Sequence, residues 1–309
     1  MIVCCGEGLI DFIPGETTTG EAAYVPAPGG SICNVAVGLG RLGVPTGFLG
    51  GVAADFFGEM LMERLRTSGV SDRYTARLPR PSTVAFVSLG GDEPEYVFYD
   101  EGAADRMWTL EDAPSLGDDV TALHFGSISL LREPAASAYA DLMRREKGRR
   151  VLTLDPNLRP SLVKDEARYR SLLAELIGLA DIVKISAADL AWWAPGEPFE
   201  TIAGGWLDGG TRLVVVTRGA EGATAYWSGG TYHAPSVAVD RVQDAVGAGD
   251  SFMAGLLAGL SADGGLSERT LSALDESAIR HAVDLAVRVA AITVTRKGAD
   301  LPTAEDLGR

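Results

Sequence analysis

The stretch Asp244-Ala245-Val246-Gly247-Ala248-Gly249-Asp250 stands at the start of a long apolar helical pattern and decides how the chain is interpreted. From Phe252 to Leu260, apolar residues recur at helical spacing. On the other side, Val237 and Val239 alternate with other residues, which predicts a strand. The two glycines and the alanine leave the backbone nearly bare where the helix begins. Its unpaired N–H groups and the positive end of its dipole therefore favour a bound anion.

Asp250 places a carboxylate beside this anion-binding turn. Such a carboxylate can take a proton from a hydroxyl while the amides of Gly247, Ala248 and Gly249 stabilise a transferring phosphoryl group. An ordinary helix N-cap would explain an isolated Asp at this position equally well. A second aspartate, Asp244, precedes the first glycine and favours the catalytic interpretation.

Residues 244–250 resemble the C-terminal signature of the ribokinase-like (PfkB) carbohydrate kinases, with Ala245 where that family usually has threonine. The family's N-terminal signature is similar to residues 29–58, which contain Gly29-Gly30, Asn34 and a series of later glycines. Residues 100–106 and 124–127 resemble the fructokinase branch in particular. The resemblance implies an enzyme that phosphorylates a sugar or nucleoside hydroxyl with ATP and a divalent metal.

The resemblance also implies individual roles for residues of the site. Asp250 is the catalytic base, the amides of Gly247, Ala248 and Gly249 form the anion hole, and Arg159 offsets the charge of the transferred group. The sugar-binding residues that it implies are Asp11, Gly29, Gly30, Asn34, Phe98, Asn157 and Asp250. The ATP-binding residues that it implies are Lys184, Thr217, Gly219, Gly247, Gly249 and Gly298. For Phe98, ordinary packing in a hairpin remains an equal alternative.

Two cation sites follow from the same resemblance. Mg²⁺ is expected to bind through water near Asp189, although this chain has Ser186 and Asp189 where the family often has Asn and Glu. Lys184 and Asp189 could equally form a surface pair of little energetic weight. A monovalent cation such as K⁺ would face Asp244 and the carbonyl of Val246.

The order of strands and helices predicts an α/β fold, a doubly wound and mainly parallel sheet with helices on both faces and a small β-lid. Strands are expected at residues 2–5, 46–51, 122–125, 151–154, 182–185 and 213–217, and helices include residues 56–67 and 278–294. Polar residues follow several of these strands, among them Asp11, Asn157 and Thr217. Because the carboxyl ends of parallel strands share one edge, these residues should converge there, independently of any family.

The whole chain, residues 1–309, is expected to form one kinase domain whose lid comprises about residues 12–28 and 82–103. Within the second segment, residues 82–89 and 95–100 predict a β-hairpin joined at residues 90–93. In the resembling family this lid covers the sugar and often provides a dimer contact, so a homodimer through the β-lid is implied.

The composition of the chain argues against some classes of binding partner. The net charge of −15 argues against nucleic acid and anionic membranes, since both require basic patches. The three cysteines, of which Cys4 and Cys5 are adjacent, make no disulfide framework. No secretory leader pattern and no uninterrupted apolar span occurs in the sequence, which predicts a cytoplasmic protein that binds a small-molecule sugar and ATP.

Other functions are less consistent with the sequence. Residues 38–43 satisfy the dinucleotide-binding pattern G-x-G-x-x-G, but a helix precedes them and a strand follows, which reverses the required order. This argues against an oxidoreductase and predicts that these glycines serve as packing contacts and as a helix stop. A non-catalytic sugar-binding protein would be favoured by a degraded Asp250 turn, which is intact. Fructose, phosphorylated at its 6-hydroxyl, is the first choice of acceptor. Alternatives are 2-keto-3-deoxygluconate, ribose, tagatose phosphate and a nucleoside.

Overall fold

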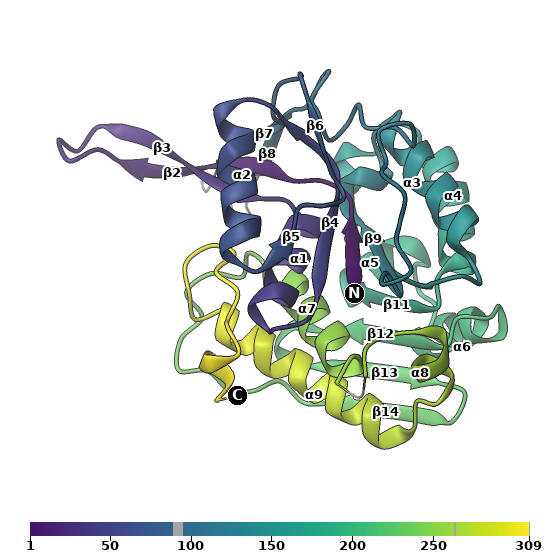
Figure 1. Cartoon of the computed structure of the whole chain (residues 1–309). Helices are drawn as coiled ribbons and strands as arrows, with labels where there is room; N and C mark the ends of the chain where they lie inside the picture. The colour runs from purple at the N-terminus through teal and green to yellow at the C-terminus, as the bar shows by residue number, and fades with distance from the viewer. Residues whose placement is uncertain (89–94, 263, 309) are drawn as a thin grey trace.

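The computed structural model describes residues 1–88, 95–262 and 264–308 and is built around one large, mainly parallel sheet (Figure 1). Its strand order is β14-β13-β12-β11-β10-β9-β1-β4-β5, and β6 also pairs with β4. Only β13 and β14 join it in antiparallel fashion. The strands are β1 (Ile2–Cys5), β4 (Thr46–Ala53), β5 (Val70–Ser71), β6 (Thr75–Leu78), β9 (Ala122–Gly126), β10 (Val151–Asp155), β11 (Ile182–Ser186), β12 (Leu213–Thr217), β13 (Ala223–Trp227) and β14 (Gly230–Ala234). The predicted fold class is confirmed.

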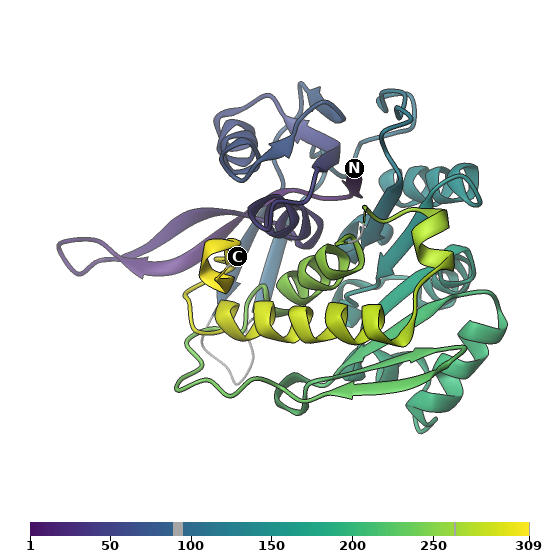
Figure 2. The ribbon, with the colours of Figure 1, turned by 60° about the horizontal axis from the view of Figure 1, so that its bottom comes forward.

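Helices cover both faces of this sheet (Figures 1 and 2). In β1 the side chains alternate: Ile2 and Cys4 join a core with α1, α7 and α9, whereas Val3 and Cys5 join a core with α3 and α4. Strands that are buried on both faces therefore appear in the sequence as continuous apolar runs. The helices are α1 (Ser31–Arg41), α2 (Phe56–Thr67), α3 (Ala135–Glu146), α4 (Glu166–Leu179), α5 (Ala187–Trp193), α6 (Phe199–Asp208), α7 (Ala248–Leu260), α8 (Glu268–Ser272) and α9 (Glu276–Thr293). Among the described residues, no helix combines the length and the apolar character that crossing a membrane requires.

A second, four-stranded sheet has the order β3-β2-β7-β8. It consists of β2 (Leu9–Glu16), β3 (Ala22–Gly29), β7 (Val84–Ser88) and β8 (Glu95–Tyr99). The strands β2 and β3 extend from the body as a long arm (Figure 1). Both segments predicted to form the lid lie in this sheet, and β7 and β8 pair antiparallel as expected for a hairpin. The predicted connection at residues 90–93 lies outside the described residues.

Two predictions of local structure are wrong. Residues 235–247 form no strand, and Val237 and Val242 are 45% and 58% exposed. Alternating valines favour a strand only where one face meets a core and a neighbouring strand is available, and neither is present here. Asp11 does not follow β1 but lies within β2 of the second sheet.

Glycines allow the helices on one face to approach closely. A Cβ atom on Gly259 of α7 would lie 2.5 Å from Cα of Ala282 in α9. A Cβ on Gly38 of α1 would lie 2.7 Å from Cβ of Ala254 in α7, and one on Gly40 would clash with the backbone after α2. Gly38 and Gly40 therefore serve packing, and Gly43, with a left-handed φ of 79° just after α1, ends the helix. This confirms the prediction and leaves no dinucleotide loop there.

We expect Gly259→Ala to destabilise the protein by about 1–3 kcal/mol, because the added methyl group meets backbone that cannot move aside. The matched control is Gly205→Ala in α6, where an added Cβ would meet nothing within 4 Å. That change should stabilise the fold by up to about 1 kcal/mol through the loss of chain entropy in the unfolded state. Urea denaturation of both variants measures the difference, and equal unfolding midpoints would contradict the packing interpretation.

Candidate active site

The N-terminus of α7 lies at the end of a turn that only glycine fits. Gly247 has a left-handed φ of 79°, and a Cβ atom on it would lie 2.8 Å from Cβ of Ala299. The amide of Ala248 closes this turn with a bond of 3.2 Å to a carbonyl within it. A Cβ on Gly249 would lie 3.3 Å from Nζ of Lys184, so an ammonium group sits beside the turn. Helix dipole and cation together suit a bound anion.

Asp250, in the first turn of α7, is 7% exposed and has both carboxylate oxygens occupied. The hydroxyl of Ser31 donates to Oδ1 at 2.7 Å, and Nδ2 of Asn34 donates to Oδ2 at 2.8 Å. Burial raises the pKa of Asp250, and these two hydrogen bonds oppose that rise. The carboxylate is thus buried, oriented and better able to accept a proton than an exposed aspartate.

Helix α1 delivers both of these donors, and its start is held from another segment. Gly30 has a φ of 95°, and a Cβ atom there would lie 2.9 Å from the carbonyl oxygen of Glu7. The amide of Cys33 donates to that carbonyl at 3.2 Å, and the amide of Ile32 donates to Oε1 of Glu7 at 3.4 Å. Glu7 therefore caps the helix from a distance and fixes where α1 begins relative to Asp250.

Asp11 lies beside the same carboxylate. A Cβ atom on Gly29 would lie 2.2 Å from Oδ2 of Asp11, so glycine is required for this carboxylate to rest against the backbone. Burial and, to a smaller extent, the negative charge of Asp250 raise the pKa of Asp11 to about 6, and Arg64 opposes the rise. The carboxylates of Asp11 on strand β2 and of Asp250 on helix α7 therefore interact electrostatically.

Lys184 is buried and forms an ion pair with Asp155, with Nζ and Oδ2 2.8 Å apart and both side chains at most 5% exposed. The alternative of a surface pair between Lys184 and Asp189 is wrong. Asp189 lies in the first turn of α5, where its amide donates to the hydroxyl of Ser186. Burial raises the pKa of Asp189, and the charge of Asp155 adds to this effect.

A chain of hydrogen bonds connects Arg159 to the base candidate. Nη1 of Arg159 donates to Oδ1 of Asn157 at 2.7 Å, and Nδ2 of Asn157 donates to Ser31 at 2.9 Å. Ser31 in turn donates to Asp250. The residues after β10 thus meet the start of α1 at the predicted edge of the sheet.

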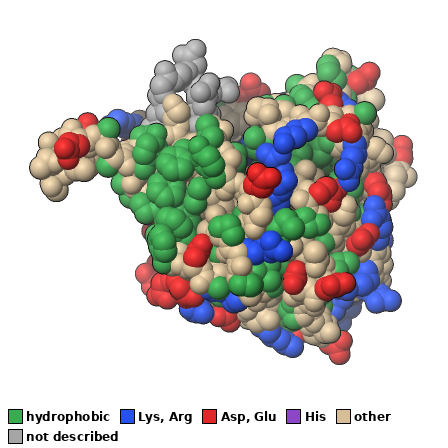
Figure 3. Space-filling model, turned by 90° about the horizontal axis from the view of Figure 1, so that it is seen from above, with side chains coloured by type: hydrophobic (Ala, Val, Ile, Leu, Met, Phe, Trp, Pro, Cys, Tyr) green, Lys and Arg blue, Asp and Glu red, His purple; other side chains and the backbone are tan. Residues whose placement is uncertain are grey.

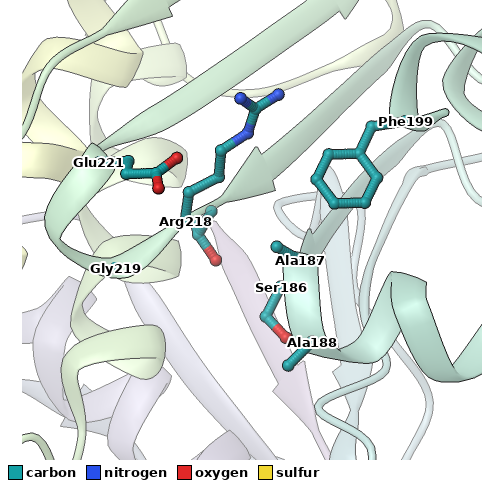
Figure 4. A pocket seen from close by; sticks show the side chains of 8 residues that line it. Ser186, Ala187, Ala188, Phe199, Arg218, Gly219 and Glu221 are labelled. Carbon is teal, nitrogen blue, oxygen red and sulfur yellow. The ribbon is translucent and has the colours of Figure 1, made fainter.

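Further along this edge lies a pocket of about 520 Å³ (Figure 4). Thr217 and Gly219, both predicted to bind ATP, lie in its wall, and Arg218 extends between Glu221 and Phe199. The guanidinium carbon of Arg218 is 5.2 Å from the centre of the Phe199 ring. The residues that line the pocket are Ser186, Ala187, Ala188, Phe199, Thr217, Arg218, Gly219 and Glu221.

Asp244 links two loops through hydrogen bonds from their backbone amides. Its Oδ1 accepts the amide of Val246 at 3.0 Å, and its Oδ2 accepts the amide of Gly298 at 2.9 Å. Gly298 is thereby placed next to the α7 turn rather than in the wall of the pocket. In the part of the chain that the structure describes, no three His, Cys, Asp or Glu side chains are grouped to hold a metal ion.

Phe98 packs at the base of the lid against an apolar cluster that includes Leu9 and Ile128. Its neighbour on the same face of β8, Tyr96, was not predicted. The register pairs Asp11 with Ala85 and Ala85 with Phe98, so Tyr96 lies on the same face of the lid sheet as Asp11. Burial raises the pKa of Tyr96, and the charges of Asp11 and Asp250 add to this rise. Alternation along β8 places Tyr96 and Phe98 on one face and could have revealed this residue.

Sequence reasoning missed several side chains of the site, and some of them carried no local signal. Ser31 directly follows the Gly29-Gly30 turn, and Asp155 lies two positions before Asn157, so both stood close to predicted residues. Arg64 lies in the last turn of α2, where a basic residue is ordinary. The missed residues are Glu7, Ser31, Arg64, Tyr96 and Asp155.

Comparison with known proteins bears on this geometry. Residues 1–306 match the profile described as pfkB family carbohydrate kinase. The chain is 47% identical to "Fructokinase" of Rhizobium leguminosarum bv. trifolii, with 92% of this chain and 87% of the relative covered. It is 33% identical to "Fructokinase" of Escherichia coli, with 98% and 96% covered.

Solved structures agree with the relatives. The structure described as fructokinase with bound ATP from Xylella fastidiosa has a TM-score of 0.90 and 28% identity, with 99% of this chain and 96% of that chain covered. Fructokinase from Vibrio cholerae O395 in a fructose, ADP and calcium ion bound form has a TM-score of 0.84 and 29% identity, with 96% and 94% covered.

We expect the carboxyl carbon of Asp11 to titrate near pH 6, well above the ordinary value of about 3.9 for aspartate. The group is then neutral below that pH and charged above it. Replacing Asp250 by Asn removes a like charge, so the pKa of Asp11 should fall. Carbon-13 NMR of the labelled carboxyl groups measures both. Titration below pH 4.5, or no response to Asp250→Asn, would contradict the electrostatic coupling.

We expect Lys184→Met to destabilise the fold by about 3–5 kcal/mol, because Asp155 is left as an unpaired buried charge. The double variant Asp155→Asn with Lys184→Met should recover part of this loss. As a surface control, Arg66→Met removes an exposed pair with Asp72 and should cost less than about 1 kcal/mol. Denaturant unfolding provides all three values, and a Lys184→Met loss no larger than that of Arg66→Met would disprove the buried-pair argument.

Proposed function

Because the chain belongs to the pfkB family of carbohydrate kinases, we propose that it is an ATP-dependent fructokinase that phosphorylates the 6-hydroxyl of fructose. The observation that carries this proposal is the Asp250 carboxylate, buried and held by two donors at the bare N-terminus of α7. Relatives named fructokinase, and solved fructokinases that contain fructose, ADP or ATP, support the choice of substrates.

On the sugar side, we assign the hydroxyl contacts to the group around Asp250. Asp11, Asn34 and Asn157 present carboxylate and amide groups to this region, and Gly29 and Gly30 let the carboxylate of Asp11 and the carbonyl of Glu7 pack against the backbone there. Phe98 and the hydroxyl of Tyr96 would close the site from the lid. In the reaction, the fructose O6–H proton passes to Asp250 as O6 forms a bond to the γ-phosphorus of ATP. The bond between that phosphorus and the β,γ-bridging oxygen breaks, and ADP leaves.

On the nucleotide side, we assign the nucleoside to the pocket of about 520 Å³ walled by Thr217 and Gly219. The phosphates would then reach the amides of Gly247 and Gly249 at the start of α7, with Lys184 alongside. Ala248 contributes mainly the shape of the turn, since its amide is used within it. Arg159, oriented by Asn157, would offset the charge of the transferred group.

Two cations fit the residues present. Repulsion by the charge of Asp155 contributes to the raised pKa of Asp189. Mg²⁺ bound through water would relieve this repulsion. When bound, Mg²⁺ neutralises phosphate charge and orients the phosphate chain. The hydrogen bond from the amide of Val246 to Asp244 brings these two residues together, and we assign the monovalent cation, K⁺, to their loop.

We further propose that residues 1–309 act as one domain whose lid sheet forms a homodimer contact. Hydrophobic side chains gather on one face beside the projecting arm (Figure 3). Four apolar side chains of the lid are 49–62% exposed: Tyr24, Val25, Val97 and Tyr99. Together they expose more apolar surface than singly scattered residues would. The three unpaired cysteines are buried, which fits a reducing cytoplasm.

We expect the purified protein to release ADP from ATP with fructose in a coupled assay. Asp250→Ala should lower kcat by at least about 10²–10⁴-fold, because the proton acceptor is removed. Asp306→Ala removes an exposed carboxylate that pairs with Arg296; it serves as the control and should retain activity. The same assay with 2-keto-3-deoxygluconate, ribose, tagatose 6-phosphate and a nucleoside tests the alternative acceptors. Equal turnover by wild type and Asp250→Ala would reject the proposal.

A further inference from the structure

Arg64 on α2 binds three separate segments of the chain through one guanidinium group. Nη1 donates to the carbonyl of Pro28 at 2.8 Å, and Nη2 donates to the carbonyl of Ala299 at 2.7 Å. Nη2 also donates to Oδ1 of Asn34 at 3.3 Å. Among the described residues, no carboxylate forms an ion pair with Arg64, so its Nη1 and Nη2 groups donate to neutral oxygens.

Each of these segments reaches a different part of the site. Pro28 lies at the end of lid strand β3, directly before the Gly29-Gly30 turn. Asn34 uses its amide nitrogen to hold Asp250 and its amide oxygen to accept from Arg64. Because a guanidinium has no acceptor, Arg64 fixes which end of the Asn34 amide faces the base.

The third segment leads to the nucleotide side. Ala299 packs against Gly247, where an added Cβ would lie 2.8 Å away. The preceding residue, Gly298, donates its amide to Asp244 in the loop that enters α7. A shift of the carbonyl of Ala299 would therefore reach the anion-binding turn through direct contacts.

We propose that Arg64 is a positioning residue that couples occupancy of the sugar site to occupancy of the nucleotide site. The inference deepens the proposed kinase function and rests on it for the identity of the two ligands. The guanidinium donors form a rigid planar fork, so the lid strand, Asn34 and the loop at Ala299 keep their bonds only when they take one mutual arrangement. A ligand that stabilises one segment in that arrangement then lowers the cost for the ligand at the other side.

Arg41 provides a matched control. It lies on α1 and anchors the same loop, since Nη1 donates to the carbonyl of Leu301 and pairs with Asp300. No contact of Arg41 with Pro28 or Asn34 occurs among the described residues. Loss of Arg41 therefore weakens the loop without cutting the bridge to the sugar side.

The first experiment uses hydrogen exchange with Mg-ADP alone, so it does not depend on the identity of the sugar. In the wild type and in Arg41→Met, nucleotide should slow exchange across residues 22–28 of lid strand β3, none of which lines the nucleotide pocket. In Arg64→Met this protection should fall by about 5-fold or more. Equal protection in wild type and Arg64→Met, or no protection in either, would overturn the proposal.

The second experiment measures the Kd of fructose by calorimetry with and without Mg-ADP. We expect a ratio of about 5 or more in the wild type and a ratio near 1 in Arg64→Met. Arg64→Lys retains the charge but not the fork, and it should also lose the coupling. A wild-type ratio in Arg64→Lys would overturn the bridge, as would an equal loss in Arg41→Met.

The two proposals fail in different ways. If no sugar of the panel is phosphorylated, the kinase proposal fails while the exchange experiment still decides on Arg64. If fructose is phosphorylated but the Arg64 variants retain both the protection and the ratio, only the coupling is wrong. Arg64→Lys also keeps the test valid should Arg64→Met not fold.

Discussion

The site depends on one contact between two helices, the pair of hydrogen bonds that α1 donates to the carboxylate of Asp250 in α7. Both donors, Ser31 and Asn34, lie in the first turn of α1, so α1 and α7 must start at nearly the same place. Glycine at position 38 allows the two helices to approach at Ala254. The packing that buries the core is therefore the same packing that orients the carboxylate of Asp250, and the two cannot vary independently.

Much of the scaffold was predictable because its signals are local. The strand β1, the helix α2 and the strand β12 have the predicted bounds, since continuous apolar runs and helical spacing are properties of neighbouring residues. The convergence of Asn157 and Thr217 at one sheet edge followed from parallel topology alone. The strand expected at Val237 failed because alternation says nothing of whether a partner strand exists.

The missing parts of the site share a physical reason: they are defined by partners far away in the chain. Arg64 meets Ala299 across 235 positions, and no property of α2 alone distinguishes it from a surface arginine. Lys184 was placed near the nucleotide, but its partner Asp155 belongs to the neighbouring strand and became visible only through strand pairing. Tyr96 required knowledge of which face of β8 is turned to Asp11.

The negative charge of the site affects how a nucleotide can bind there. Four carboxylates, those of Asp11, Asp155, Asp189 and Asp250, lie near one sheet edge in a chain of net charge −15, and burial or mutual repulsion raises the pKa of three of them. The nearby cation Lys184 is already paired. A nucleotide would bring more negative charge into this region, so it gains most when it arrives with a divalent cation that the carboxylates attract. The negative charge that helps to raise the pKa of Asp250 would thus also favour binding of the nucleotide together with a metal ion.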